Sequence, residues 1–416
     1  MDCPNPKRSA GAAAAADLPD DALVQILSRL PIKPLCRSKC VAKGWRDLIA
    51  HPLHRRKLPQ TLAGFFYGSG GGGGRTSGWT RQRQEFVNFI NMLWASGVPF
   101  VDPPFPFFED LPGIENVSLL GSCNGLLLFD YVLEYHDPVF IVCNPATKQW
   151  VTVPSKHIPA YSGYLVKHTC LIFDPAASSH FHVVQFWENL KETLVHAYSS
   201  KTGVWRSSRC HWGSFSIARD LASAFFNGKL YLALNGRNEH WIVAWDTEGG
   251  TRKIIPLPFL KGQKWCLPVS DYVGQSQGRL HYIYHEQGLL EADEPIEDVN
   301  GFEADYATDF VGTEGWSYEL CIWVLEDYDT EQWELKHTVS FLELFGKVNC
   351  RMGYKVIAIH PDHNLLFLVQ HWNQKLISYD MDSREVRDLC TLAHGYGSIT
   401  PYVPFFLESE AFENKE

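Results

Sequence analysis

A repeated hairpin pattern after residue 117 constrains the fold of this chain more than any other sequence feature. An apolar run led by Gly or Asn begins at Gly125, Gly228, Gly278 and Asn364, and a second run that ends in a polar turn follows each. The polar turn units are 144–150, 199–205, 246–250, 327–333 and 380–384. A short polar side chain at the start of such a unit can bond the turn backbone. Three units end in Trp, which can cover a neighbouring sheet.

The spacing of these units predicts a β-propeller. Most successive units start about 50 residues apart, close to the roughly 40 to 50 residues of a four-stranded blade. The wide gap between 246 and 327 contains an acidic segment, 291–309, which we interpret as a loop inserted within a blade. A parallel β-helix is the competing repeat architecture, but its coils are shorter and lack these turns. We expect about six blades, the last closed by pairing of 402–407 with 62–67.

Residues 18–50 predict a small all-α unit of three short helices. Four apolar residues share one helical face at i, i+3, i+4 and i+7: Leu23, Ile26, Leu27 and Leu30. Pro31 ends this helix, and Pro34 begins a second one that runs to about Val41. A third helix is indicated by a further set at helical spacing: Val41, Trp45, Leu48 and Ile49.

Three short helices cannot cover this much apolar surface among themselves, which points to docking on another protein. The segment 29–57 holds nine Lys or Arg residues and one acidic residue, Asp47, so an acidic partner surface is favoured. Periodicity alone leaves the alternative equally open that the helices pack on the rest of the chain as an N-terminal cap.

The order of residues in this unit resembles the F-box motif in its plant form. Leu18-Pro19-Asp20-Asp21, Leu30-Pro31-Ile32-Lys33 and Trp45-Arg46 lie at the offsets of that motif. The resemblance implies binding to a Skp-family adaptor and, through it, to a cullin scaffold. The residues that match adaptor-contacting positions of the family are Leu18, Pro19, Ile26, Leu27, Leu30, Leu35, Val41 and Trp45. Pro34 and Gly44 stand where the family more often has Ser.

Two further strings resemble the plant F-box-associated domain, a kelch-like β-rich module. They are 122–128 (SCNGLLL) and 142–150 (VCNPATKQW). The resemblance implies a protein-recognition domain, and it rests on architecture alone after about residue 170. The expected organisation is a disordered leader at 1–16, an F-box at 17–57, a connecting region at 58–116 with a possible first propeller strand, and a propeller-like substrate domain at 117–410. Within the connecting region, 85–94 are expected to form a turn or two of helix.

Composition narrows the classes of partner and compartment. A net charge of -10 disfavours a dedicated nucleic-acid binder, because phosphate neutralisation needs clustered Lys and Arg. No run reaches the roughly 18 apolar residues of a membrane span. Eleven Cys without a regular spacing, and no secretory signal, predict buried thiols in the cytoplasm or nucleus.

The sequence contains no convincing catalytic or metal-binding motif. His281 and His285 lie four residues apart, but in a strand-like run, so we interpret them as ordinary strand residues. No Cys-x-x-Cys pair, calcium-loop pattern or hydrolase triad can be assembled. The sequence therefore predicts no cofactor, no metal and no enzyme.

Two functions remain from the sequence. The first is a substrate-recognition subunit of an SCF-type ubiquitin ligase, which binds a protein target through the β domain. The second is a β-propeller enzyme or carbohydrate-binding lectin with an N-terminal helical cap.

Overall fold

The computed structural model describes most of the chain in two units. The described residues are 18–30, 34–35, 38, 41–50, 54, 62–69, 87–92, 105, 114–133, 139–154, 156, 165–175, 177–189, 192–210, 212, 215–217, 223–235, 240–246, 252–257, 269–289, 316–347, 353–393, 396–405 and 409–412. One unit is Met1–Thr61 with Pro175–Ser178, and the other is Leu62–Asp174 with Ser179–Glu416. The predicted leader and the acidic insertion at 291–309 lie outside the described residues.

The first unit contains α1 (Asp20–Leu27) and α3 (Lys43–Ala50). Asp20 and Asp21 occupy the first turn of α1, where carboxylates complement the helix dipole. The expectation of three helices is not confirmed. Between α1 and α3, Pro34, Leu35 and Ser38 are helical, and the Ser38 hydroxyl donates to the Pro34 carbonyl at 2.9 Å, but the bounds of that helix fall outside the described residues.

α1 ends at Leu27, one turn before the predicted end at Pro31. The N–H groups of Arg29 and Leu30 donate to carbonyls three residues earlier, at 3.1 Å in both cases. Such i to i+3 bonds tighten the end of a helix into a turn.

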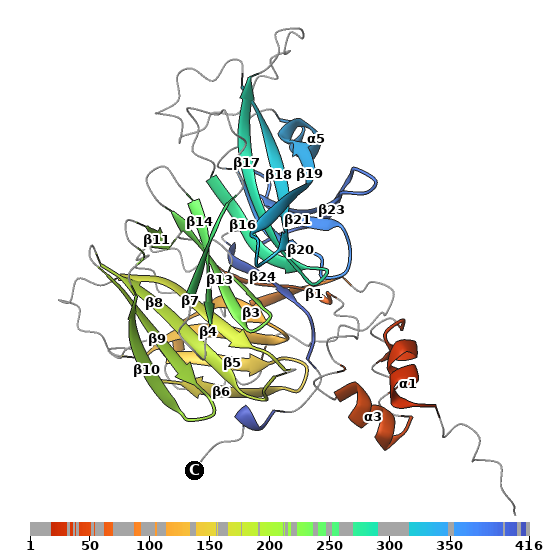
Figure 1. Ribbon diagram of the computed structural model, residues 1–416, viewed down its shortest axis with the longest axis vertical. Coiled ribbons are helices and arrows are strands. Elements are labelled where there is room, and N and C mark those ends of the chain that lie inside the picture. Colours follow the sequence, from red (N-terminus) through yellow and green to blue (C-terminus); the bar gives the residue numbers. More distant parts are fainter. Residues whose placement is uncertain are drawn as a thin grey trace, which may run out of the picture. The chain divides into compact units, whose positions relative to one another are not determined.

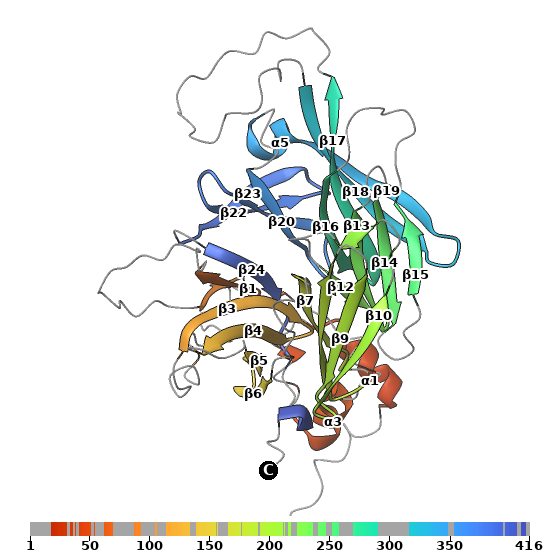
Figure 2. The same ribbon diagram turned by 90° about the vertical axis from the view of Figure 1, so that its left-hand side faces the viewer.

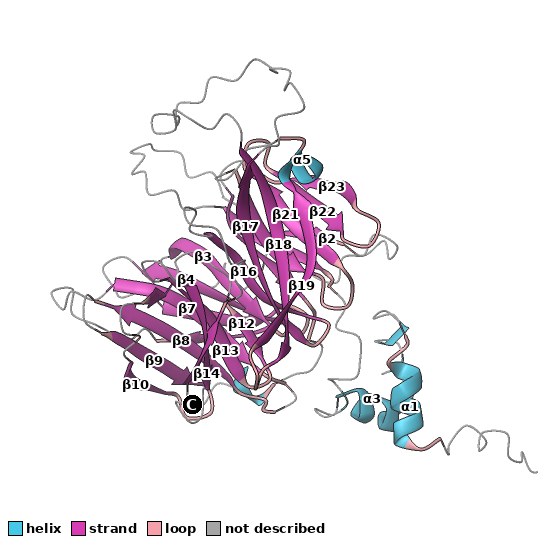
Figure 3. Ribbon diagram, turned by 45° about the horizontal axis from the view of Figure 1, so that its top comes forward, coloured by secondary structure: helices cyan, strands magenta, loops and turns pink. Residues whose placement is uncertain are grey.

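The described strands form six sheets, each of antiparallel neighbours (Figures 1 and 3). The first sheet is β3 (Ile114–Cys123), β4 (Leu126–Leu133), β5 (Val139–Asn144) and β6 (Gln149–Val153). The second sheet is β7 (Leu165–Phe173), β8 (Phe181–Glu188), β9 (Thr193–Ser199) and β10 (Val204–Cys210). The third sheet is β11 (Ser216–Ile217), β12 (Ala224–Phe226), β13 (Lys229–Asn235), β14 (His240–Asp246) and β15 (Arg252–Pro256).

The remaining sheets continue in chain order. The fourth sheet is β16 (Val269–Ser276), β17 (Arg279–Leu289), β18 (Trp316–Asp327) and β19 (Gln332–Ser340). The fifth sheet is β20 (Tyr354–Ile359), β21 (Leu365–Gln370), β22 (Lys375–Asp380) and β23 (Glu385–Thr391). The sixth sheet joins β24 (Tyr396–Tyr402) to β1 (Gly64–Ser69) and β2 (Val87–Asn91). The six-bladed propeller predicted from the repeat is confirmed.

The sixth blade closes the ring by pairing strands from the two ends of the propeller. β1 pairs with β24, with Gly64 opposite Tyr402 and Phe66 opposite Thr400 (Figure 2). The closing strand ends at Tyr402, so it overlaps the predicted 402–407 at that residue alone. Residues 87–91 are also a strand, not a helix, because they pair with Gly64–Gly68 of β1.

Four of the polar turn units join the third and fourth strands of a sheet, and the remaining unit, 246–250, begins at the last residue of β14 and extends outside the described residues. Asp327 and Asp380 each accept backbone N–H bonds within their turns, at 2.7 Å from Asp329 and 2.9 Å from Asp382. At the turns between first and second strands, Asn124-Gly125, Asn227-Gly228 and Gln277-Gly278 have positive φ at both residues. That geometry makes two-residue type I′ hairpins, whose twist matches the strands.

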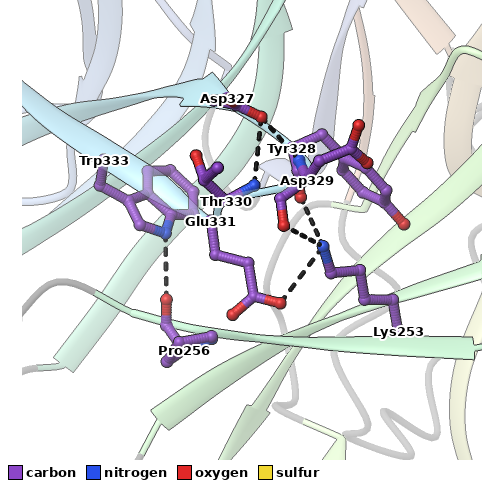
Figure 4. A network of polar contacts seen from close by, with 8 residues as sticks. All are labelled: Lys253, Pro256, Asp327, Tyr328, Asp329, Thr330, Glu331 and Trp333. Carbon is purple, nitrogen blue, oxygen red and sulfur yellow. Dashed lines mark hydrogen bonds and ion pairs between the residues drawn. The ribbon is translucent and has the colours of Figure 1, made fainter.

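Trp residues at the ends of two polar turn units donate hydrogen bonds to the neighbouring sheet. The Trp205 indole donates to the Pro154 carbonyl at 2.7 Å, and the Trp333 indole to the Pro256 carbonyl at 3.0 Å. Beside Trp333, the Lys253 ammonium contacts the Glu331 carboxylate at 3.2 Å and lies 4.5 Å from the Tyr328 ring centroid (Figure 4). The hydrophobic cores of the propeller lie between adjacent sheets. A central strand such as β21, the second strand of the fifth sheet, is therefore buried on both faces.

Candidate functional site

The core of the helical unit fixes which apolar residues remain available for contact. Six buried side chains form that core: Leu23, Val24, Leu27, Leu35, Leu48 and Ile49. Leu27 is 0% exposed and Leu35 is 2% exposed. These two predicted contact residues therefore hold the helices together, because their side chains are already covered by their own unit.

The other predicted contact residues lie at or near the surface. Leu18 is 55% exposed, Ile26 47% and Val41 65%, and Pro19 is also exposed. Leu30 and Trp45 are half-buried and pack against the core. Large apolar side chains at such exposure cost free energy in water unless another surface covers them. We refer to Leu18, Pro19, Ile26 and Val41 as the exposed helical set.

The propeller has two edges with different connections. Because neighbouring strands are antiparallel, the turns between first and second strands share one edge with the turns between third and fourth strands. The opposite edge carries the connections between second and third strands and from one sheet to the next. We name it the long-connection edge, since β1 ends and β2 begins there, as do β17 and β18, and these strand ends are far apart in the sequence. Binding residues concentrate on long connections that a rigid scaffold positions.

A cavity of about 650 Å³ lies among the inner strands of the propeller. Its lining comes from all six sheets and includes Ser122, Asp130, Gln185, Tyr272, Lys355 and Thr400. Burial raises the pKa of Asp130, although Ser118 hydrogen bonds oppose that shift. The inner strands thus enclose a cavity that is lined by both polar and apolar side chains.

The histidines weighed as metal ligands are packing residues of β17. His285 is buried, and its Nδ1 lies 3.0 Å from the Tyr354 hydroxyl. His281 Nδ1 lies 3.2 Å from the Arg279 carbonyl, and burial lowers the pKa of His281 to about 4. Among the described residues, no group of three or more His, Cys, Asp or Glu could hold a metal ion.

The described cysteines are free thiols in the propeller. Burial raises the pKa of Cys123 to about 12 and that of Cys321 to about 12. The thiolate is the reactive form, so these side chains are inert at neutral pH. In the part of the chain that is described, no helix has the length and apolarity to cross a bilayer.

Sequence reasoning missed one element at the long-connection edge, the short helix α5 (Phe341–Phe345). The Ser340 hydroxyl accepts a hydrogen bond from the Glu343 N–H at 3.1 Å, and Gly346 ends the helix with φ 66°. The signal was present as Ser-x-x-Glu followed by Gly, an N-terminal cap and a C-terminal stop.

Two family models each match a part of the chain. A model described as an F-box domain matches residues 16–57. A model described as the β-propeller of F-box protein At3g26010-like matches residues 103–289.

Relatives from Arabidopsis thaliana are similar over larger parts of the chain. F-box protein At5g07610 is 29% identical over 66% of this chain and 65% of its own length. Putative F-box protein At3g16210 is 26% identical over 58% of this chain and 61% of its own length. F-box/kelch-repeat protein At3g23880 is 24% identical over 81% of this chain and 89% of its own length. The match to the first two spans just under two thirds of those relatives.

Proposed function

Since the chain is a plant F-box protein, with an F-box followed by a β-propeller, we propose that it is the substrate-recognition subunit of an SCF-type cullin ubiquitin ligase. The F-box match at 16–57 supports docking to a Skp-family adaptor, and the adaptor would link the chain to the cullin. The propeller would bind a protein target. The observation that carries this proposal is the exposure of Leu18, Ile26 and Val41 on a unit whose own core is complete without them.

The eight sequence-predicted contact residues divide into two roles in this proposal. The exposed helical set would contact the adaptor directly, with Leu30 and Trp45 contributing their accessible edges. Leu27 and Leu35 would act indirectly, by fixing the distance between the helices. The three-helix arrangement predicted for residues 18–50 is part of the same proposal.

The chain itself would be non-catalytic. An adaptor-bound receptor raises the local concentration of its target beside a ubiquitin-conjugating enzyme held elsewhere on the scaffold, so the rate gain comes from proximity. The residues needed from this chain are therefore contact residues, and the propeller supplies a rigid frame for them.

The test is co-purification of the full chain with a Skp-family adaptor. We expect Ile26→Asp to weaken adaptor binding at least about tenfold, since a charge at the centre of an apolar interface is left desolvated. Gln25→Asp is the matched control, because Gln25 is an exposed polar neighbour on the same helix and the substitution adds the same charge. Leu27→Asp is unsuitable, because it places a charge in the core and unfolds the unit.

The circular dichroism spectrum of the full chain should be the same in Ile26→Asp and Gln25→Asp as in the wild type, which shows that the β domain is still folded. Full adaptor binding by both Ile26→Asp and Val41→Asp would contradict the proposal.

A further inference from the structure

An aromatic patch with a cation on it lies at the long-connection edge of the propeller. It consists of Leu342 and Phe345 on α5, Trp372 on the turn between β21 and β22, and Lys347 after α5. Leu342 is 59% exposed and Trp372 is 39% exposed. The Phe345 and Trp372 rings meet edge to face at 5.6 Å, and the Lys347 ammonium lies 4.4 Å from the Trp372 ring centroid.

The patch is held rigidly from below. Phe341 and Leu344 of α5 are buried in the core shared by the fourth and fifth sheets. The Tyr354 ring packs on both Phe341, at 5.1 Å, and Phe345, at 5.3 Å. Figure 2 shows α5 near the upper end of β17. A surface whose side chains are already ordered loses little conformational entropy when a partner binds.

The charge of the patch is positive, although the chain as a whole carries -10. Lys347 is exposed, and its ammonium lies over the Trp372 ring. Glu343, the acidic residue of α5, is already engaged by the Tyr379 hydroxyl at 3.0 Å and the Arg384 guanidinium at 3.2 Å. An occupant with carboxylates would therefore meet the Lys347 ammonium.

We propose that this patch binds an acidic segment of the protein target, with an apolar side chain of that segment seated between Leu342 and Trp372. The proposal deepens the proposed function and rests on it, because it names the class of target. Exposed apolar residues scattered singly are ordinary on protein surfaces. Here an aromatic pair and a cation are in contact, and an exposed aliphatic residue lies three positions before Phe345 on the same anchored helix, which is typical of interface hot spots.

A second copy of the chain is a less suitable occupant. A two-fold interface centred on this patch would bring Lys347 opposite its own equivalent, and like charges would repel. An acidic peptide instead complements the cation and covers the exposed apolar area.

The test is fluorescence anisotropy with the full chain and three synthetic peptides. The probe peptide places Leu and Phe among Glu residues. One matched peptide has Lys in place of Glu, and the other has Ser in place of Leu and Phe. We expect the probe to bind at least about tenfold more tightly than either matched peptide, and its affinity to fall with rising salt.

Two variants test whether the probe peptide binds at the patch. Trp372→Ala and Lys347→Glu should each weaken the probe about tenfold, while Val204→Ala and Lys201→Glu, exposed on another blade, should not. Equal binding of the three peptides, or undiminished binding by both patch variants, would overturn the proposal. So would concentration-dependent dimerisation of the wild type that Trp372→Ala abolishes.

Adaptor co-purification separates this proposal from the proposed function. Trp372→Ala should keep full adaptor binding, whereas Ile26→Asp should keep full peptide binding. A chain that bound the probe but no adaptor would refute the ligase role and leave the patch standing as an acidic-peptide site.

Discussion

Phe405 packs directly against Gly125, so closely that a Cβ added to Gly125 would lie 2.4 Å from the Phe405 Cβ. Gly125 closes the first hairpin of the first sheet, and Phe405 follows the last strand of the ring. The Phe405 carbonyl also accepts a hydrogen bond from the Asn144 side chain at 2.9 Å. The chain after β24 therefore packs against the first sheet and is hydrogen-bonded to it.

This contact makes Gly125 the more sensitive of two equivalent glycines. Gly125 and Gly228 both have positive φ in type I′ turns, but a Cβ at Gly228 would meet nothing within 4 Å. We expect Gly228→Ala to cost about 1 kcal/mol of unfolding free energy and Gly125→Ala about 3 kcal/mol, because the second adds a steric clash to backbone strain. Urea unfolding followed by tryptophan fluorescence measures both. Equal losses would show that the added methyl group at Gly125 does not clash with Phe405.

The hydrogen bond from the Trp333 indole to the Pro256 carbonyl should contribute measurably to the unfolding free energy, because it joins neighbouring sheets. Trp333→Phe keeps an aromatic ring but leaves the Pro256 carbonyl without its indole donor, so we expect a loss of about 1 kcal/mol in unfolding free energy. Trp372→Phe is the control, since that indole lies on an exposed turn. If the two variants unfolded at the same urea concentration as the wild type, the hydrogen bond would be energetically neutral.

Ring closure depends on Phe65 of β1. Its side chain is fully buried and packs on Phe367 with ring centroids 5.0 Å apart. We expect Phe65→Ala to cost about 3 to 5 kcal/mol, because it removes a large buried ring and leaves a cavity beside the closing pair of strands. Hydrogen exchange should show faster opening in β1 and β24 than in β8 and β9. Uniform loss of protection over all sheets would indicate that the ring opens as one unit instead.

Stability should fall on mild acidification through His281. Burial, followed by the charge of Lys336, lowers the pKa of His281 from its ordinary 6.5 to about 4. Between these values the unfolded chain binds a proton that the folded chain does not, so unfolding is favoured as pH falls. The effect is about 1 to 2 kcal/mol between pH 7 and pH 5. His281→Phe should remove this part of the pH dependence in urea titrations, and an unchanged pH profile would contradict the assignment.

Local patterns in the sequence were sufficient for the hairpins and for the helical face. Turn residues such as Asn144, Asp327 and Asp380 act on backbone groups two or three positions away, so their effect is visible in a short window. The period of those turns then gave the propeller, because each blade is one repeat of the same four-stranded unit. The relative positions of the Leu-Pro and Trp-Arg pairs identified the helical unit, because they are those of the F-box motif.

Long-range contacts decided what the sequence left open or misassigned. Residues 87–91 are a strand because β1 offers them a partner, and no pattern within 85–94 indicates that partner. Leu27 and Ile26 are adjacent and equally apolar, yet one fills the core and the other faces solvent. That choice depends on where the neighbouring helix lies.

The sequence by itself determined a helical F-box followed by a repeated four-stranded β unit, because turn chemistry and apolar periodicity are properties of neighbouring residues. Only the tertiary structure decided the bounds and register of the strands that close the ring, which F-box residues remain exposed, and that Phe345, Lys347 and Trp372 meet on one surface. Those outcomes depend on packing between segments far apart in the chain, and such packing leaves no local signature.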